Sequence, residues 1–83
     1  NELDPTNSDF SVYPNPSEGV FYIKTSLSNE HEVLIYNNLG QVVKKTKFNS
    51  GSKIDLTKEA NGIYHIIILD NGKAVFSTKL IRN

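Results

Sequence analysis

The sequence predicts an all-β domain, a sandwich of two sheets with about seven mostly antiparallel strands. Two observations support this fold class. From Phe10 onward apolar and polar residues alternate with a period of two, which is typical of strands with one buried face. Turn signals also recur at short intervals along the chain, while no window of about 11 residues shows a helical apolar stripe. Seven short strands with tight turns fit two packed sheets.

The composition excludes several functional classes. The chain has 83 residues, which is one domain, and it has no cysteine and therefore no disulfide framework or thiolate metal site. Nine basic and nine acidic residues cancel, which argues against nucleic-acid binding. No apolar run approaches the roughly 20 residues that span a membrane. Because methionine is absent, we expect a segment of a longer precursor, with any export signal upstream.

The polar, proline-containing residues 1–9 are expected to form a linker or leading arm, and residues 10–83 the folded domain. The first strand is expected over Phe10–Tyr13. The prolines of Pro14-Asn15-Pro16 supply no ladder donor, so they end this strand in a bend that Gly19 completes. The next strand follows over Val20–Thr25.

A hairpin is predicted in the middle of the chain. Its first strand is His31–Asn37, and its loop is Asn38-Leu39-Gly40, with Gly40 in the left-handed conformation. The returning strand, Gln41–Phe48, carries three lysines, which suit a solvent-facing or edge strand.

The last strands follow closely. Lys53–Leu56 is short, with Ile54 and Leu56 expected to point inward. Gly62 opens the strongest strand, which extends to Asp70. Asn71-Gly72 is a two-residue hairpin signal, since both central residues of such a turn need positive φ. Ala74–Arg82 then closes the domain.

No constellation of catalytic or metal-binding residues is evident. His31 and His65 lack the further ligands that zinc requires, so each is interpreted as a solvent-facing imidazole. Asp55 and Asp70 lie where turns and strand ends favour aspartate, and nothing indicates that they meet as an acid–base pair. We therefore expect no enzymatic activity, no metal and no cofactor.

The strand after Gly62 has a more informative pattern. Tyr64 is expected in the core, with its hydroxyl at the rim. Ile67 and Leu69 make the opposite face of this strand apolar as well. Either the strand is central and covered on both sides, or Ile67 and Leu69 form a contact patch.

The terminal Lys79-Leu80-Ile81-Arg82 also has two interpretations. Leu80 would pack inward with Phe76 and Thr78, while the flanking cations are solvated. Alternatively, this segment is a recognition end, accessible because it is terminal.

An ordered set of short motifs extends along nearly the whole chain, from Phe10 to Asn83. The set resembles the type A carboxyl-terminal sorting domain of the type IX secretion system of Bacteroidetes. The motifs that carry this resemblance are Tyr13-Pro14-Asn15-Pro16, Gly19, Ile35-Tyr36, Leu39-Gly40, Ile54-Asp55-Leu56, Gly62-Ile63-Tyr64, Gly72-Lys73 and Lys79-Leu80-Ile81.

The resemblance implies an immunoglobulin-like sandwich that acts as a non-catalytic address label on a larger Sec-exported cargo. It implies as partners the outer-membrane translocon with its shuttle components and a sortase-like cysteine peptidase that removes the domain. The destination would be the periplasm in transit, and then the cell surface or the medium. The residues that it emphasises are Pro14, Asn15, Pro16, Gly19, Gly62, Tyr64, Lys79 and Leu80.

The sequence departs from the family pattern at Glu59, where leucine is common, and at Asn37, where aspartate is common. The rival hypothesis is an accessory β-sandwich, a carbohydrate-binding or spacer module. Such a module would present a row of aromatic side chains, whereas Tyr13, Tyr22, Tyr36 and Tyr64 fall on four different strands.

Overall fold

The computed structural model describes residues 10–14, 16–27, 29–49 and 51–83. Seven strands form two sheets, which confirms the predicted fold class. Their bounds are β1 Phe10–Tyr13, β2 Val20–Thr25, β3 His31–Asn37, β4 Val42–Phe48, β5 Ser52–Asp55, β6 Gly62–Asp70 and β7 Lys73–Arg82. The expected leading arm, residues 1–9, lies outside the described residues.

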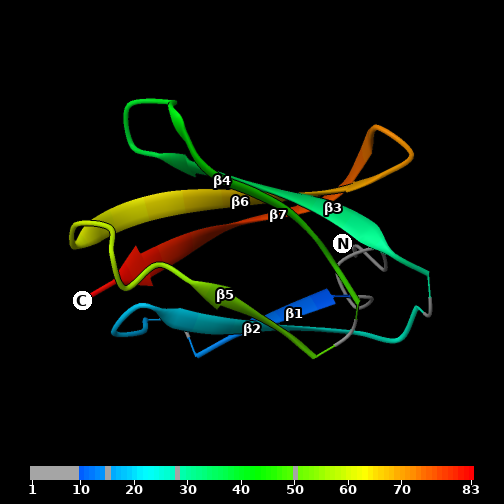
Figure 1. Cartoon of the computed structure of the whole chain (residues 1–83), viewed down its shortest axis with the longest axis horizontal. Coiled ribbons are helices and arrows are strands. Elements are labelled where there is room, and N and C mark those ends of the chain that lie inside the picture. The colour runs from blue at the N-terminus through cyan, green and yellow to red at the C-terminus, as the bar shows by residue number, and fades with distance from the viewer. Residues whose placement is uncertain (1–9, 15, 28, 50) are drawn as a thin grey trace, which may run out of the picture.

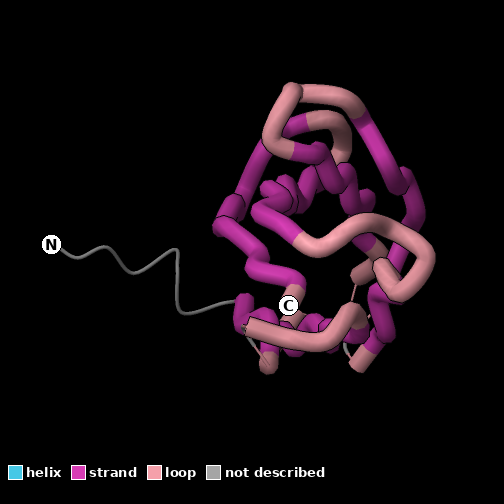
Figure 2. The backbone as a smooth tube through the Cα atoms, turned by 90° about the vertical axis from the view of Figure 1, so that its left-hand side faces the viewer, coloured by secondary structure: helices cyan, strands magenta, loops and turns pink. Residues whose placement is uncertain are grey.

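The two sheets lie face to face, as Figure 1 shows. The lower sheet in this view has the order β1-β2-β5, and the upper sheet has the order β4-β3-β6-β7. All neighbouring strands are antiparallel. The view along the strands in Figure 2 shows the two layers enclosing the interior between them. This arrangement is an immunoglobulin-like sandwich.

The core lies between the sheets and is built from alternate residues of each strand. Phe21 and Ile23 on β2 face Val33 and Ile35 on β3, and all four side chains are fully buried. The remaining buried apolar residues are Phe10, Phe48, Ile54, Leu56, Tyr64, Ile66, Ile68 and Leu80. The period of two therefore identified the core face of these strands.

The two predicted hairpins have the expected backbone conformations. Asn71 and Gly72 both have positive φ, 52° and 81°. Gly40 has a φ of 85° in the turn between β3 and β4. That turn is also held by Asn37, whose Oδ1 accepts hydrogen bonds from the backbone N–H groups of Leu39 and Gln41 at 2.9 and 3.0 Å. The departure from aspartate at this position therefore leaves the hairpin intact.

The interpretation of His31 as a solvent-facing side chain is wrong. His31 is only 2% exposed and lies between Phe10 and Phe48, with ring centroids 5.3 and 5.7 Å away. The physical reason is strand parity, because His31 alternates in step with Val33 and Ile35 and so points into the sandwich. His65, which alternates out of step with the core residues of β6, is exposed as expected.

Candidate functional site: the end of the sandwich that holds the carboxyl-terminal strand

The motifs that are far apart in the sequence meet at one end of the sandwich. Figure 1 shows β7 ending on the left, beside the loop from β5 to β6 and the start of β2. We call this region the terminal node. It consists of Ser17, Gly19, Leu56, Thr57, Tyr64, Arg82 and Asn83.

Ser17 attaches the proline turn to the end of β7. Its backbone N–H donates to the Ile81 carbonyl at 2.9 Å, and its carbonyl accepts from the Asn83 N–H at 2.8 Å. These two bonds form a short parallel bridge with Arg82. The Ser17 side chain stabilises the turn itself, because its hydroxyl donates to the Val20 carbonyl at 2.6 Å. Backbone hydrogen bonds therefore hold the proline turn against the end of the last strand.

Gly19 allows the next segment to approach closely. Its φ is +129°, which disfavours any residue with a side chain, and a Cβ there would lie 2.9 Å from the Thr57 Cγ2 atom. Its carbonyl accepts a hydrogen bond from the Leu56 N–H at 2.6 Å. Glycine is thus required here by both conformation and space.

Arg82 joins β7 to the loop between β5 and β6. Its Nε donates to the Leu56 carbonyl at 2.9 Å and its Nη2 to the Thr57 carbonyl at 3.1 Å. Its Nη1 donates to Asn61 Oδ1 and to the Asn83 carbonyl. The expectation that the cations flanking Leu80 are solvated is therefore wrong for Arg82, whose planar guanidinium reaches several acceptors at once.

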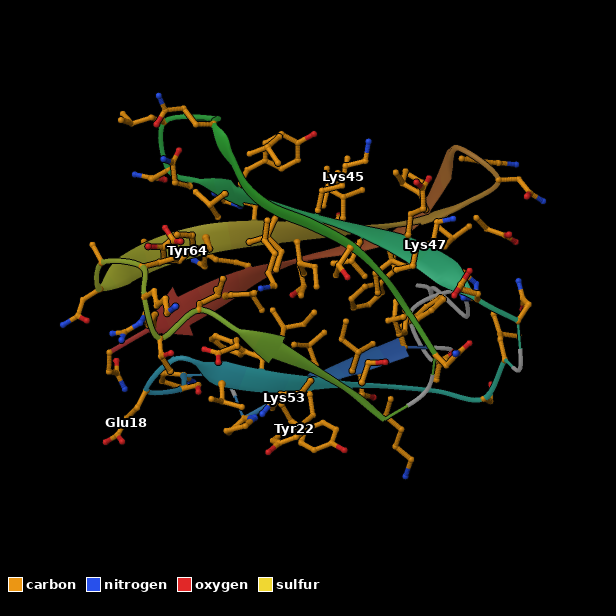
Figure 3. The ribbon with its side chains drawn as sticks, viewed as in Figure 1. Glu18, Tyr22, Lys45, Lys47, Lys53 and Tyr64 are labelled. Carbon is orange, nitrogen blue, oxygen red and sulfur yellow. The ribbon has the colours of Figure 1, made fainter. Side chains whose placement is uncertain are left out.

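Tyr64 fixes the same loop from inside. The side chain is 5% exposed, and its hydroxyl donates to the Ala60 carbonyl at 2.5 Å. A tyrosine near the start of this strand that bonds to backbone a few residues upstream is the tyrosine corner of immunoglobulin-like sandwiches. Tyr64 is labelled beside this loop in Figure 3. The prediction of a core tyrosine with its hydroxyl at the rim is confirmed.

Asp55 organises the start of the loop and is not part of an acid–base pair. Its Oδ1 accepts from the Thr57 hydroxyl at 2.6 Å and from the Thr57 N–H at 2.9 Å. These bonds, helped by Lys53 and Lys44, lower the pKa of the Asp55 carboxyl below its ordinary value. Asp70 lies at the opposite end of the sandwich, because Asp55 pairs with Val20 whereas Asp70 ends β6 near Phe10.

A surface hollow of about 500 Å³ adjoins the terminal node. Its lining residues are Pro14, Pro16, Ser17, Glu18, Val20, Thr57 and Asn83. Pro14 and Pro16 are exposed at its edge. Asn15, which the sequence also singled out, lies outside the described residues.

The described residues contain no group of three or more His, Cys, Asp or Glu side chains placed to hold a metal ion. That part of the chain also has no helix with the length and apolar character needed to span a membrane.

The family can now be stated. Residues 11–83 match the family described as the secretion system C-terminal sorting domain. The chain belongs to this family. The sequence-based resemblance is confirmed.

Three relatives illustrate where such domains occur. The sorting domain is 34% identical over 77 residues to an endo-acting ulvan lyase of Formosa agariphila, 38% identical over 74 residues to ulvan lyase NLR42 of Nonlabens ulvanivorans, and 39% identical over 80 residues to β-agarase A of Zobellia galactanivorans. These matches cover 89%, 87% and 94% of the chain, but only 15%, 14% and 14% of the relatives. The chain therefore corresponds to a small part of each relative.

The sorting domain is an export signal of the type IX secretion system. The family is non-catalytic, and its members accompany larger cargo to the cell surface or the extracellular space.

The structure divides the motif residues by exposure. Gly19, Tyr64 and Leu80 are buried and hold the fold together. The exposed motif residues are Pro14, Pro16, Gly40, Gly62, Lys79 and Ile81. Sequence reasoning did not single out Ser17, and it named Arg82 in the terminal segment without predicting its contacts with the loop between β5 and β6. A serine two residues before a turn glycine, and an arginine rather than a lysine at the end of the last strand, were the signals available for them.

Proposed function

We propose that the type IX export machinery recognises this sorting domain through the exposed side chains of Lys79 and Ile81 together with Pro14 and Pro16. The supporting observation is the pair of backbone hydrogen bonds that joins Ser17 to Ile81 and Asn83, because these bonds hold two distant motifs next to each other. Recognition is non-catalytic on the part of the domain, and a sortase-like peptidase would cleave upstream of the folded part.

The chemistry of this surface suits a receptor with a carboxylate and an apolar recess. Lys79 supplies an extended cation, and Ile81, which is 36% exposed, supplies an apolar contact. The proline rings beside the 500 Å³ hollow present rigid apolar surface. Because these rings are already fixed, a partner that binds them loses little affinity to conformational entropy.

A simple truncation cannot test this proposal. Removing residues 79–83 would also remove Leu80, which is fully buried, and Arg82, which holds the loop between β5 and β6. The domain would lose stability, and export would fail for that reason alone. Point variants on the exposed side chains separate recognition from folding.

The experiment fuses the domain to a periplasm-competent reporter in a type IX host and compares K79A/I81S with the unchanged domain. We expect the double variant to accumulate the reporter in the periplasm. Its free energy of unfolding in urea should stay within about 0.5 kcal/mol of that of the unchanged domain. The matched control is Lys53→Ala, an exposed lysine on the other sheet, which should export normally. Surface delivery of K79A/I81S at the unchanged rate would contradict recognition through the terminal strand.

One observation favours the rival function, carbohydrate binding. Tyr13 and Tyr22, although on different strands, stack with ring centroids 5.9 Å apart and are 46% and 38% exposed. Tyr22 projects below the three-stranded sheet in Figure 3. If this pair binds glycans, ulvan or agarose oligosaccharides should bind the isolated domain in calorimetry, and Tyr22→Ala should abolish that binding. The other two tyrosines do not extend the pair, since Tyr64 is buried and Tyr36 lies on the other sheet.

A further inference from the structure

The outer face of the four-stranded sheet carries a group of apolar side chains that His65 interrupts on β6. Strand register brings together Leu34 with Ile67, Tyr36 with Val42, and Ile63 with Ile81 as directly opposed pairs. Leu69 continues the group on β6. We call this set, Leu34, Tyr36, Val42, Ile63, Ile67, Leu69 and Ile81, the outer apolar stripe.

The stripe is accessible to a partner. Val42, Ile63 and Ile81 are 52%, 40% and 36% exposed, and the other members are half-buried only by their neighbours in the sheet. β6 is central, as one sequence interpretation held, but no described element covers its outer face. The three-stranded sheet differs, since Ser11, Lys24, Lys53 and Asp55 accompany its two tyrosines outside. An apolar face of this extent on a solvated sheet is typical of an interaction surface.

Lysines border the stripe on both outer strands. On β4, Lys45 lies opposite Leu34, and Lys47 lies opposite Glu32. On β7, Lys79 lies opposite His65. Figure 3 shows Lys45 above β4, on the side away from the three-stranded sheet. The face therefore has three lysines and one glutamate around its apolar residues, and His65 lies among these between Tyr36 and Lys79.

The charges and the shape of this face indicate which kind of partner binds it: a second copy of the chain, a membrane or another protein. A second copy of the chain would pair the face with itself, which brings lysine margins toward each other at a cost. A membrane surface is met by protruding apolar side chains, whereas Leu34, Ile67 and Leu69 are half-buried in a flat sheet. A protein surface that is apolar at its centre and acidic at its margins complements the face in both respects.

The size of the face indicates a transient contact. Four strands about 4.8 Å apart and about seven residues long give a face of roughly 19 by 23 Å. Such an area is at the lower end for specific protein interfaces, where short-lived complexes are found. A weak contact suits a sorting signal, because cargo must leave the machinery after delivery.

We infer that the outer apolar stripe is a docking surface for a component of the type IX machinery whose contact surface is apolar in the middle and carries carboxylates at its margins. This inference rests on the proposed function for the identity of the partner. The docking surface shares Ile81 and the neighbouring Lys79 with the recognition surface proposed above. Lys45, Lys47 and Ile67 belong to the docking surface alone, so variants at these three positions test it separately.

The test measures binding of the purified outer-membrane translocon of a type IX host to the immobilised full chain. We expect K45E/K47E to weaken binding at least tenfold and I67S to weaken it to a similar degree. Binding of the unchanged chain should also fall as salt is raised from 50 to 500 mM. The matched control is K24E/K53E, which makes the same charge change on the outer face of the other sheet and should bind normally. Each variant is first checked for an unchanged circular dichroism spectrum.

The outcomes separate this inference from the proposed function. Equal binding by K45E/K47E, I67S and the unchanged chain would overturn the docking surface, even if K79A/I81S still blocks export. Absence of binding by the unchanged chain would overturn it as well, whereas export of its reporter fusion would still support the proposed function. Concentration-dependent dimers that I67S abolishes, or binding to phosphatidylglycerol vesicles that K45E/K47E abolishes, would overturn it in favour of a second copy or a membrane.

Discussion

At the scale of single residues, the terminal node depends on residues whose structural roles are not evident from the sequence. Gly19 is a steric requirement, Ser17 connects two distant segments, and Asp55 shapes a turn through Thr57. None of these roles requires chemical reactivity. Conformation, hydrogen bonding and close packing therefore explain why the motifs contain glycine, serine and aspartate.

Gly19→Ala should lower the free energy of unfolding by roughly 3 kcal/mol. The substitution combines a disfavoured φ of +129° with a Cβ only 2.9 Å from Thr57 Cγ2 and 3.0 Å from Thr57 Cα. Gly40→Ala is the matched control, since its φ is +85° but no atom lies within 4 Å of its Cβ. Gly40→Ala should lower the free energy of unfolding by about 1 kcal/mol. Urea unfolding of both variants makes the comparison, and equal losses would show that the contact with Thr57 is unimportant.

The Asp55 carboxyl should titrate below 3.8 in the folded chain, because the Thr57 hydroxyl and then the Thr57 N–H donate to it. A folded pKa below the unfolded one adds stability that is fully present above the unfolded pKa. This stability is lost as the pH falls through the folded pKa. Thr57→Val removes the hydroxyl donor and should move the pKa back toward 3.8. It should also lower stability at pH 7, and the difference should disappear as the pH falls below the folded pKa.

NMR titration of the Asp55 side-chain carbon gives the pKa directly, and urea unfolding at several pH values gives the stability difference. A pKa in Thr57→Val equal to that of the unchanged chain would contradict the assignment of the hydroxyl as the main cause.

At the scale of elements, the decisive feature is how β7 is attached. Its pairing with β6 extends from Lys73 to Arg82 and positions Leu80 in the core. The bonds from Ser17 and Arg82 add attachments to the proline turn and to the loop after β5. The last strand is thus held from three directions, while the side chains of Lys79 and Ile81 stay on the outer face.

Arg82→Ala should destabilise the chain by about 2 kcal/mol, because the Leu56 and Thr57 carbonyls lose a charged donor. Arg82→Lys should recover only part of this loss, since an ammonium group cannot reach both carbonyls in one geometry. Lys79→Ala is the control on the same strand and should change stability by less than about 0.5 kcal/mol. Hydrogen exchange of the Leu56 and Asn83 amides should accelerate in Arg82→Ala. Unchanged protection there would show that Arg82 does not hold the end of β7.

At the scale of the whole molecule, two thin sheets share one core, and the two ends of the sandwich differ. The end with the terminal node is held by polar bonds between loops. The other end is held by aromatic contacts between the sheets, in which Phe10 of β1 packs against His31 of β3 and against Phe76 of β7. Both His31 ring nitrogens are buried without a hydrogen-bond partner among the described residues.

His31→Leu should leave the free energy of unfolding unchanged or raise it by about 1 kcal/mol. Removing a buried polar group without a partner offsets the loss of the ring contacts with Phe10 and Phe48. His65→Leu, at an exposed position of β6, provides the comparison for a surface change. A loss of more than about 2 kcal/mol in thermal and urea unfolding of His31→Leu would indicate that the imidazole makes a stabilising interaction.

The sequence by itself determined the strands, the turns and the core face, because these depend on local periodicity and backbone preference. Phe21, Ile23, Val33 and Ile35 alternate with polar residues, and Asn71-Gly72 permits only a tight hairpin. The bounds of the strands accordingly agree with expectation at most ends and differ by one residue at the others. The same alternation places His31 on the core face of its strand. Its burial could have been predicted if this position in the pattern had been given more weight than the polarity of the side chain.

Only the tertiary structure decided which motifs meet and which side chains remain exposed. Ser17 and Arg82 are 65 residues apart in numbering, and their bridge depends on the packing of two sheets rather than on any local preference. Arg82 donates to the Leu56 and Thr57 carbonyls of the loop after β5 because the packing of the sheets places that loop beside the end of β7. Distant contacts of this kind leave no periodic signal in the chain, since they arise only after the elements have packed.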